Sequence, residues 1–214
     1  MKDNNTKDNI KNIISLNYII SEIKVDKFFM ITQDDLNALC TLIDSINANI
    51  MIEFGVQQGC TASAILKTFN YIHKYIGIDV EKGYEPFYSF QKKEIPYDAG
   101  CYAKKDARFN LITKPKGTFD ISYKELPIAD IIFIDGDHSI KGIINDTILA
   151  FASIRKYGIV CWHDYRSLSI IKKALSVLSN KFNLEISCLK DSNIAYTIFD
   201  LPKSKFIKLL KNIV

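Results

Sequence analysis

The sequence has little arginine, proline and glycine, and it has no long apolar run. Only Arg108, Arg155 and Arg166 among its 28 basic residues are arginine, and the net charge is a mild +4. Arginine forks bind base edges and phosphates best, so we expect no nucleic-acid partner. Because no apolar stretch approaches the roughly 18 residues of a membrane-spanning helix, we also expect no membrane span. The 5 prolines and 9 glycines argue against a disordered or fibrous chain.

Cysteine is also scarce, and its pattern excludes two kinds of stabilising site. The five cysteines, at 40, 60, 101, 161 and 188, are odd in number and contain no C-x-x-C pair. Neither a disulfide framework nor a structural zinc site is therefore expected. The first residues, Met1–Asn12, are too polar for a signal peptide, which together with the free cysteines predicts a cytoplasmic protein.

The apolar pattern predicts a strand, a helix and a second strand between residues 49 and 80. Asn49–Gly55 and Tyr75–Val80 are short apolar runs typical of buried parallel strands, and Thr61–Phe69 has helical periodicity. Further strands are predicted at Phe109–Ile112, Ala129–Asp135, Tyr157–Asp164, Leu184–Leu189 and Ala195–Phe199, and helices at Ile10–Ile23, after Thr32, at Lys141–Ile154, at Ser169–Leu178 and at Ser204–Val214. The fold class predicted is α/β, a Rossmann-like doubly wound, mostly parallel seven-stranded sheet with N-terminal helices and a C-terminal antiparallel hairpin.

The chain reads as one structural domain with three parts. Residues 1–47 form a predicted N-terminal helical cap, which could serve as a second lid or as the surface of a homodimer. Residues 48–200 form the ligand-binding domain, and residues 201–214 form a C-terminal helix. Within the ligand-binding domain, residues 81–110 are irregular and rich in aromatic side chains, and a long segment of this kind is more often functional than idle. We expect that segment to bind the substrate or to close over it.

Four predicted strands end in acidic residues or histidine. Glu53 is followed by a glycine turn, Asp79 ends the next strand, Asp135 begins an Asp-Gly-Asp-His run, and His163 is followed by Asp164. Ligands of open parallel sheets bind outside the carboxyl ends of the strands. The sequence therefore predicts a ligand site at that edge of the sheet.

The turn after the first strand has the pattern Glu53-x-Gly55-x-x-x-Gly59. It is neither the dinucleotide fingerprint G-x-G-x-x-G nor a P-loop, and no lysine follows Gly59 to bind a phosphate. Glu53 lies inside an apolar strand, which is costly unless the carboxylate is paired, for example with an amino group of the ligand. Asp79, 24 residues beyond Gly55, can accept both hydroxyl groups of a ribose.

Taken together, these motifs resemble a known family. The first glycine turn followed by Gly77-Ile-Asp79 is similar to the nucleoside-binding signature of class I S-adenosylmethionine-dependent methyltransferases. Asp135-Gly-Asp-His-Ser139 and the run Gly158–Tyr165 resemble a small-molecule and sugar O-methyltransferase subgroup, the macrocin O-methyltransferase-like and cephalosporin-hydroxylase-like proteins. The resemblance covers roughly residues 48–200. It implies that S-adenosylmethionine is bound by Glu53, Gly55, Gln57, Gly59, Thr61, Asp79, Thr118 and Asp135.

The resemblance also implies a divalent metal. Asp135, His163 and Asp164 are the expected ligands, and Mg²⁺ or Mn²⁺ is the expected ion where a metal takes part. Tyr165 stands where catechol-type relatives carry a further oxygen ligand. If the two strands are neighbours, Asp135, Asp137, His138, His163 and Asp164 converge on one small volume. His138, His163 and Asp164 are the expected catalytic residues, with a histidine as base.

The expected function is methylation of a hydroxyl group on a sugar, glycan precursor or other small molecule. The alternatives are a metal-dependent hydroxylase-like or other glycan-modifying enzyme, a nicotinamide-dependent oxidoreductase, a nucleic-acid methyltransferase and a non-catalytic nucleoside-binding subunit. Asp146 could orient His138 or be a solvated helix residue, and these two interpretations stay open. Trp162 is expected in the core by strand alternation.

Overall fold

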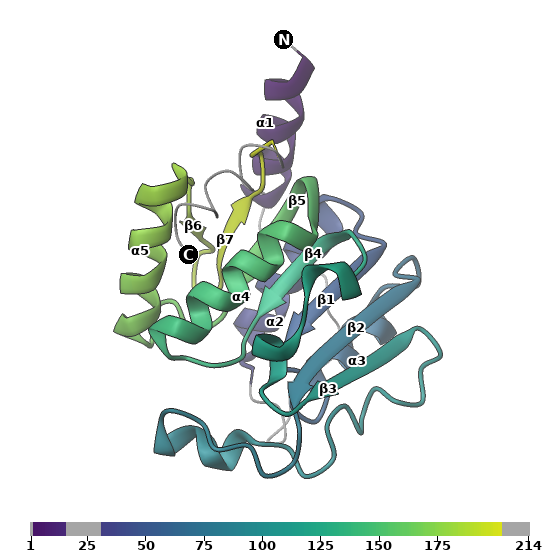
Figure 1. Cartoon of the computed structure of the whole chain (residues 1–214). Coiled ribbons are helices and arrows are strands. Elements are labelled where there is room, and N and C mark those ends of the chain that lie inside the picture. The colour runs from purple at the N-terminus through teal and green to yellow at the C-terminus, as the bar shows by residue number, and fades with distance from the viewer. Residues whose placement is uncertain (1, 16–30, 203–214) are drawn as a thin grey trace.

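The computed structural model describes residues 2–15 and 31–202, and Figure 1 shows their arrangement. One seven-stranded sheet has the order β3-β2-β1-β4-β5-β7-β6. Its strands are β1 (Ile50–Phe54), β2 (Lys74–Val80), β3 (Phe109–Lys114), β4 (Ala129–Ile134), β5 (Ile154–Trp162), β6 (Ser187–Cys188) and β7 (Ala195–Ile198). The helices are α1 (Lys2–Ser15), α2 (Gln33–Ser45), α3 (Cys60–Thr68), α4 (Ile140–Ser153) and α5 (Ser169–Phe182), with 3-10 turns η1 (Ser89–Glu94), η2 (Gly117–Asp120) and η3 (Tyr123–Glu125).

The sheet is parallel from β3 to β5, and β7 runs antiparallel between β5 and β6. This confirms the predicted doubly wound sheet with its C-terminal antiparallel hairpin. The strand order reverses at β1, which pairs with β2 on one side and β4 on the other. Such a reversal opens a crevice at the carboxyl ends of the neighbouring strands, and ligands bind there. The predicted division into cap, ligand-binding domain and C-terminal helix stays a prediction.

Helices cover both faces of the sheet and create two apolar cores. Residues from α1, α2 and α3, such as Leu39 and Ile65, pack with Tyr75 and Phe133 on one face. On the other face, α4 and α5 pack against strand residues that include Trp162. Successive strand residues alternate between the two cores because side chains of a strand point to opposite faces. Trp162 is buried, as predicted, and its indole Nε1 donates a hydrogen bond to Thr147 Oγ1 at 3.0 Å.

Local signals in the sequence explain several element ends. Thr32 is the predicted N-cap of α2, and its Oγ1 accepts a hydrogen bond from the backbone nitrogen of Asp35 at 3.1 Å. Strand β5 begins at Ile154, three residues before the predicted start. Helix α5 continues to Phe182 and ends where Asn183 adopts a left-handed conformation with φ 52°. The predicted helix at residues 10–23 is described only through Ser15, and the helix predicted at residues 204–214 lies outside the described residues.

Residues 81–110 form a mostly irregular segment with the single short helix η1, at the bottom of Figure 1. Its backbone is tied to the turn after β1. Gly100 nitrogen donates to the carbonyl of Gln57 at 2.7 Å, and Tyr102 nitrogen donates to the carbonyl of Gln58 at 3.0 Å. The segment therefore packs on the glycine turn that the sequence marks as a binding element. Among the described residues, no helix has both the length and the apolar character needed to cross a membrane.

Candidate active site

The turn between β1 and α3 depends on two glycines with positive φ. Gly55 has φ 85° and Gly59 has φ 82°, a region that side chains other than glycine adopt at a cost. A Cβ atom on Gly59 would lie 3.0 Å from the Cα of Gly100. The backbone of residues 81–110 thus packs on Gly59, and the predicted contact of Gly59 with the cofactor stays a prediction.

Asp79 holds this turn from the end of β2. Its Oδ2 accepts a hydrogen bond from the backbone nitrogen of Gln57 at 2.6 Å, and its Oδ1 accepts one from Val80 nitrogen at 2.7 Å. Burial raises the pKa of the Asp79 carboxyl to about 6, and these two backbone hydrogen bonds oppose that rise. The carboxylate keeps further lone pairs, so it can also accept hydroxyl groups of a ligand.

Glu53 is deeply buried and is satisfied within the protein. The hydroxyl of Tyr75 donates to Glu53 Oε2 at 2.8 Å, and only 2% of the residue is exposed. Burial raises the pKa of this carboxyl well above its ordinary value. The predicted pairing of Glu53 with an amino group of the ligand stays a prediction, because Tyr75 already provides a donor.

A cavity of about 100 Å³ opens at the carboxyl ends of the strands, where the order reverses. Its walls come from the glycine turn, from the ends of β2 and β4, from residues 84–95 and from η2. Five of the eight predicted cofactor-binding residues line it, namely Gly55, Gln57, Asp79, Thr118 and Asp135. The other three, Glu53, Gly59 and Thr61, are not among its lining residues.

Thr118 and Asp146 line this cavity and are hydrogen-bonded to each other. The Thr118 hydroxyl donates to Asp146 Oδ1, and Asn145 Nδ2 donates to the same atom at 3.3 Å. Asp146 is 1% exposed, so the interpretation of a solvated helix residue is wrong. Its hydrogen bonds go to Thr118 and Asn145 instead of His138. Burial raises the pKa of Asp146 to about 7, and the hydrogen bond from Thr118 opposes that rise.

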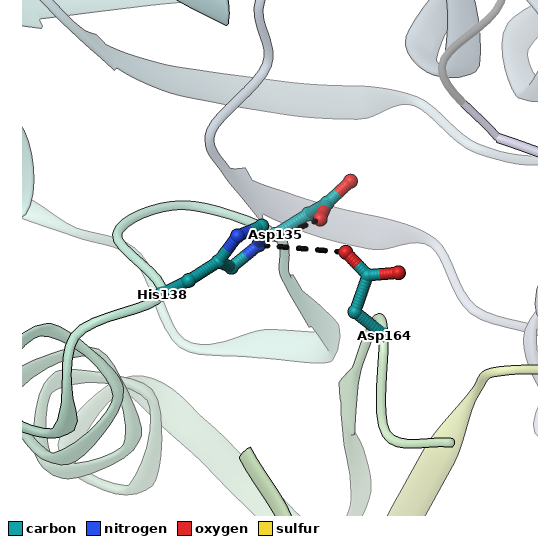
Figure 2. Close-up of side chains that lie close together, drawn as sticks. All are labelled: Asp135, His138 and Asp164. Atoms are coloured by element: carbon teal, nitrogen blue, oxygen red, sulfur yellow. Dashed lines mark ion pairs between the residues drawn. The ribbon is translucent and has the colours of Figure 1, made fainter. Parts of the chain in front are cut away.

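Asp135, which lines the cavity, lies close to His138 and Asp164, and Figure 2 shows these three side chains together. One ligand atom from each residue lies within 4.8 Å of the others. His138 Nε2 is 3.8 Å from Asp135 Oδ1 and 3.6 Å from Asp164 Oδ2, too far for hydrogen bonds. Both ring nitrogens of His138 are buried without a hydrogen-bond partner. Buried polar atoms are normally satisfied, so the two ring nitrogens of His138 are available to a ligand atom.

His163 has a different environment. Its Nδ1 lies 3.1 Å from Asp135 Oδ1, and its Nε2 lies 3.3 Å from Oδ2 of Asp35, which belongs to α2. Burial would lower the pKa of His163, but Asp135 and Asp35 raise it well above its ordinary value. Burial would likewise raise the pKa of Asp135, but the charge of His163 lowers it to about 2. The sequence names His163 as a metal ligand, and this stays a prediction. His163 Nδ1 also lies 3.8 Å from Asp164 Oδ2, but both of its nitrogens face carboxylates within hydrogen-bonding distance, whereas those of His138 have no hydrogen-bond partner.

Asp137 does not join this cluster, although the sequence predicts that it could. Its Oδ1 accepts a hydrogen bond from Ser139 nitrogen at 2.8 Å, and its Oδ2 accepts one from the Ser139 hydroxyl at 3.0 Å. Ser139 in turn caps α4 by accepting from Gly142 nitrogen. Asp137 therefore shapes the turn that leads into α4.

The trio of Asp135, His138 and Asp164 fits a divalent metal. Two carboxylate oxygens and one imidazole nitrogen form a donor set of the kind that Mn²⁺ and related ions accept. The two orphaned nitrogens of His138 support this assignment, because one of them would become a ligand atom. Metal-bound histidines usually donate their other ring N–H to a neighbouring polar group.

Two residues of the site were missed from the sequence. Asp35 appears there only as an acid in the first turn of a helix, and nothing in the pattern connects it to His163, 128 positions away. Gln91 lies in η1 and donates from Nε2 to the carbonyl of Gly136 at 3.3 Å, while its Oε1 is buried without a partner. The aromatic content of residues 81–110 indicates a functional segment, but no sequence pattern distinguishes Gln91 from its neighbours.

Comparison with known structures places the fold among methyltransferases. The Podospora anserina methyltransferase PaMTH1 with bound S-adenosylhomocysteine (SAH) is similar, with a TM-score of 0.61 and 12% identity over 92% of this chain and 88% of that chain. The O-methyltransferase NovP is similar with a TM-score of 0.60 and 13% identity, over 92% of this chain and 98% of that chain. An O-methyltransferase from Bacillus cereus in complex with SAH is similar with a TM-score of 0.55 and 12% identity, over 91% of each chain. At these identities the likeness concerns the fold.

The sequence itself identifies the family. Curated protein sequences give no match to the chain. The model of a family described as a methyltransferase domain matches residues 52–165, a region that contains Gly55, Asp79, Asp135, His138 and Asp164. Because the match spans more than half of the chain, the protein belongs to this methyltransferase family, and it has the fold of class I S-adenosylmethionine-dependent O-methyltransferases.

Proposed function

We propose that the protein transfers the methyl group of S-adenosylmethionine to a hydroxyl group of a small molecule. The observation that carries this proposal is the cluster of Asp135, His138 and Asp164 next to the cavity at the switch point of the sheet. An alcohol is a weak nucleophile near neutral pH, so a hydroxyl acceptor needs such a group of charged and basic side chains. A cofactor-binding subunit without catalysis would have no use for an orphaned histidine between two carboxylates.

The cavity walls supply the contacts for the cofactor. Asp79 would accept the ribose hydroxyls, and Thr118 with Asp146 lies where the adenine edge would reach. Asp135 and Glu94 also line the cavity, so its walls are acidic and favour the positively charged sulfonium. The cavity of about 100 Å³ is smaller than a typical small-molecule site. Residues 84–95 would therefore move outward when the cofactor binds.

The transfer itself is a single displacement. The acceptor oxygen attacks the methyl carbon, the carbon–sulfur bond breaks, and the electron pair stays on sulfur to leave SAH. The hydroxyl proton must go to a base. His163 is less suited to that role because both of its nitrogens lie within hydrogen-bonding distance of carboxylates, whereas those of His138 have no hydrogen-bond partner. Holding the methyl group in line with the acceptor oxygen supplies much of the remaining acceleration.

We assign the metal-ligand set to Asp135, His138 and Asp164, with His138 in place of His163. A bound Mg²⁺ or Mn²⁺ would lower the pKa of the acceptor hydroxyl. Without the ion, His138 is the histidine that is free to accept the proton, and its neighbours favour this. Burial lowers its pKa, but the carboxylates of Asp135, Asp164 and Glu94 outweigh burial and raise the pKa.

Residues 81–110 support the proposed class of acceptor. Tyr84 and Pro86 line the cavity, and flat apolar surfaces of this kind stack on sugar rings and on planar molecules. A sugar or glycan precursor fits this surface, and residues 81–110 would bind it or close over it.

The test is calorimetric titration of SAH into the purified full chain, with Mn²⁺ and then with a chelator. We expect micromolar binding in at least one buffer. Release of SAH from S-adenosylmethionine is then measured with a panel of hydroxyl-bearing sugars and phenols. D164N should keep SAH affinity and lose turnover. D191N is the matched control, because Asp191 also has a positive φ (59°, against 55° for Asp164) but lies exposed on the β6–β7 turn. Failure of SAH to bind in either buffer would overturn the proposal.

A further inference from the structure

A buried carboxylate from outside the matched methyltransferase region reaches the active site. Asp35 lies on α2, before residues 52–165, and its exposed fraction is 0%. Its two oxygens have separate partners. Oδ1 accepts a hydrogen bond from Asn193 nitrogen at 2.5 Å, whereas Oδ2 accepts the Thr32 hydroxyl at 2.7 Å and lies 3.3 Å from His163 Nε2.

His163 is held from three sides. Asp35 faces its Nε2, Asp135 faces its Nδ1 at 3.1 Å, and the ring of Phe133 packs edge-on at a centroid distance of 5.9 Å. Only 6% of the surface of His163 is exposed, so water does not compete for these contacts. The imidazole therefore transmits the position of Asp35 to Asp135 as a rigid spacer.

The atom of Asp135 that His163 contacts also faces the metal cluster. Oδ1 of Asp135 lies 3.1 Å from His163 Nδ1 and 3.8 Å from His138 Nε2. The orientation of this oxygen thus depends on the ring of His163. Groups that orient metal ligands commonly change metal affinity by about 10–100-fold when they are removed.

We propose that Asp35 is a positioning residue of the active site, which acts through His163 to fix the Asp135 carboxylate in the place where it meets a divalent cation with His138 and Asp164. This inference rests on the metal-ligand set of the proposed function. It adds to the active site a side chain from α2, which lies before residues 52–165.

The competing explanation is that Asp35 only ties α2 to the β6–β7 turn. The two roles use different atoms, so one substitution separates them. Asp35→Asn keeps a carbonyl oxygen for Asn193 nitrogen but replaces the oxygen near His163 with an amide nitrogen, which cannot accept a hydrogen bond. The same change removes the hydrogen bond from the Thr32 hydroxyl, which H163N leaves intact. Asp34→Asn is the matched control, because Asp34 is the neighbouring acid of the same helix turn and is exposed.

The experiment measures Mn²⁺ affinity of the full chain by calorimetry and SAH affinity in a chelating buffer. We expect D35N to bind Mn²⁺ about 10–100-fold more weakly with SAH affinity unchanged, and D34N to match the wild type. Wild-type Mn²⁺ affinity in D35N would overturn the proposal. A wild-type chain that binds SAH but no Mn²⁺ would also overturn it and would leave methyl transfer standing.

A double-mutant cycle with His163→Asn tests whether Asp35 acts on Asp135 through His163. If Asp35 acts through His163, D35N should cause no further loss of Mn²⁺ affinity in the H163N background, whereas independent effects would add. An additive loss contradicts the proposal. H163N also decides the question should D35N fail to fold, because it leaves the bonds of Asp35 to Thr32 and Asn193 in place. It should lower Mn²⁺ affinity to the same degree, and an unchanged affinity would overturn the positioning role.

Discussion

The backbone of Gly55 lies directly against the backbone of Asp135. A Cβ atom on Gly55 would come within 2.2 Å of the carbonyl oxygen of Asp135 and 2.7 Å of Gly136 Cα. The two strands are also joined just before this point, since Asp135 nitrogen donates to the carbonyl of Phe54 at 2.8 Å. The glycine turn and Asp135, which we propose as a metal ligand, therefore form one packed unit.

Gly55→Ala should damage both sites at once. The clash involves backbone atoms that cannot rotate away, and alanine also pays for the positive φ of 85°. We expect the free energy of unfolding, measured with urea, to fall by roughly 3 kcal/mol or more, and SAH binding to be lost.

Gly83→Ala is the matched control for this substitution. Gly83 has a similar φ of 91°, but no atom lies within 4 Å of the Cβ position. The free energy of unfolding of this variant should fall only by the roughly 1–2 kcal/mol that alanine costs at a positive φ, and its SAH affinity should be unchanged. Equal losses in the two variants would show that the contact with Asp135 contributes nothing.

The affinity for SAH should depend on the ionisation of Asp79. Burial raises the pKa of this carboxyl to about 6, and the charged form is the stronger acceptor for ribose hydroxyls. Between about pH 5 and pH 7 the carboxyl loses its proton, so SAH affinity should rise by up to roughly tenfold. Asp79→Asn should bind SAH more weakly, with a flatter pH profile.

Titration of SAH at several pH values checks this expectation. Asp120→Asn is a suitable control, because Asp120 is an exposed acid that accepts a hydrogen bond from Lys116 nitrogen within η2. It should reproduce the wild-type profile. A wild-type affinity in D79N, or an unchanged slope, would remove Asp79 from the ribose assignment.

The sequence predicted the scaffold well because its signals are local. Apolar runs such as Ile131–Ile134 are long enough to show a buried strand, and Thr32 marks the start of α2 by its own side chain. The acids at the strand ends were found because parallel strands place their carboxyl ends at one edge. Asp79 and Asp135 are both at that edge, and both line the cavity.

What the sequence missed depends on contacts between distant segments. The sequence offers both His138 and His163 as bases, whereas in the structure only His163 has hydrogen-bond partners, one of which is Asp35 on a helix 128 positions earlier. Likewise, nothing in the sequence indicates that residues 81–110 fold back and bring Gly100 against Gly59. A pattern of residue types carries no record of such packing.

Gln91 should fasten the segment 81–110 over the cavity. Its Nε2 donates to the carbonyl of Gly136, and Gln91 is 5% exposed in a helix whose other residues are mostly open to solvent. Gln91→Ala removes this bond, worth about 0.5–1.5 kcal/mol, and its buried contacts. Trypsin should then cut faster after the exposed Lys92 and Lys93, and Ser89→Ala in the same helix should leave the rate unchanged. An unchanged rate in Q91A would contradict the fastening role.

Asp146 should make the protein less stable as pH rises. Burial raises the pKa of its carboxyl in the folded chain to about 7, against an ordinary value of 3.8. Between these two values the folded chain holds a proton that the unfolded chain has lost, so stability falls across this window and the loss is complete above about pH 7. Asp146→Asn cannot titrate and still offers an oxygen to Thr118. Its stability relative to the wild type should therefore grow from about pH 4 to pH 8, by at most roughly 4 kcal/mol.

Urea unfolding of both chains across this pH range measures the effect. For D191N, at the exposed β6–β7 turn, the free energy of unfolding should change with pH as in the wild type, since the carboxyl of Asp191 is open to solvent. A constant difference between D146N and the wild type at every pH would mean that Asp146 ionises alike in the folded and unfolded chains. The hydrogen bond from Thr118 would then be one to a permanently charged carboxylate, and Asp146 would present the adenine end of the cavity with a full negative charge near neutral pH.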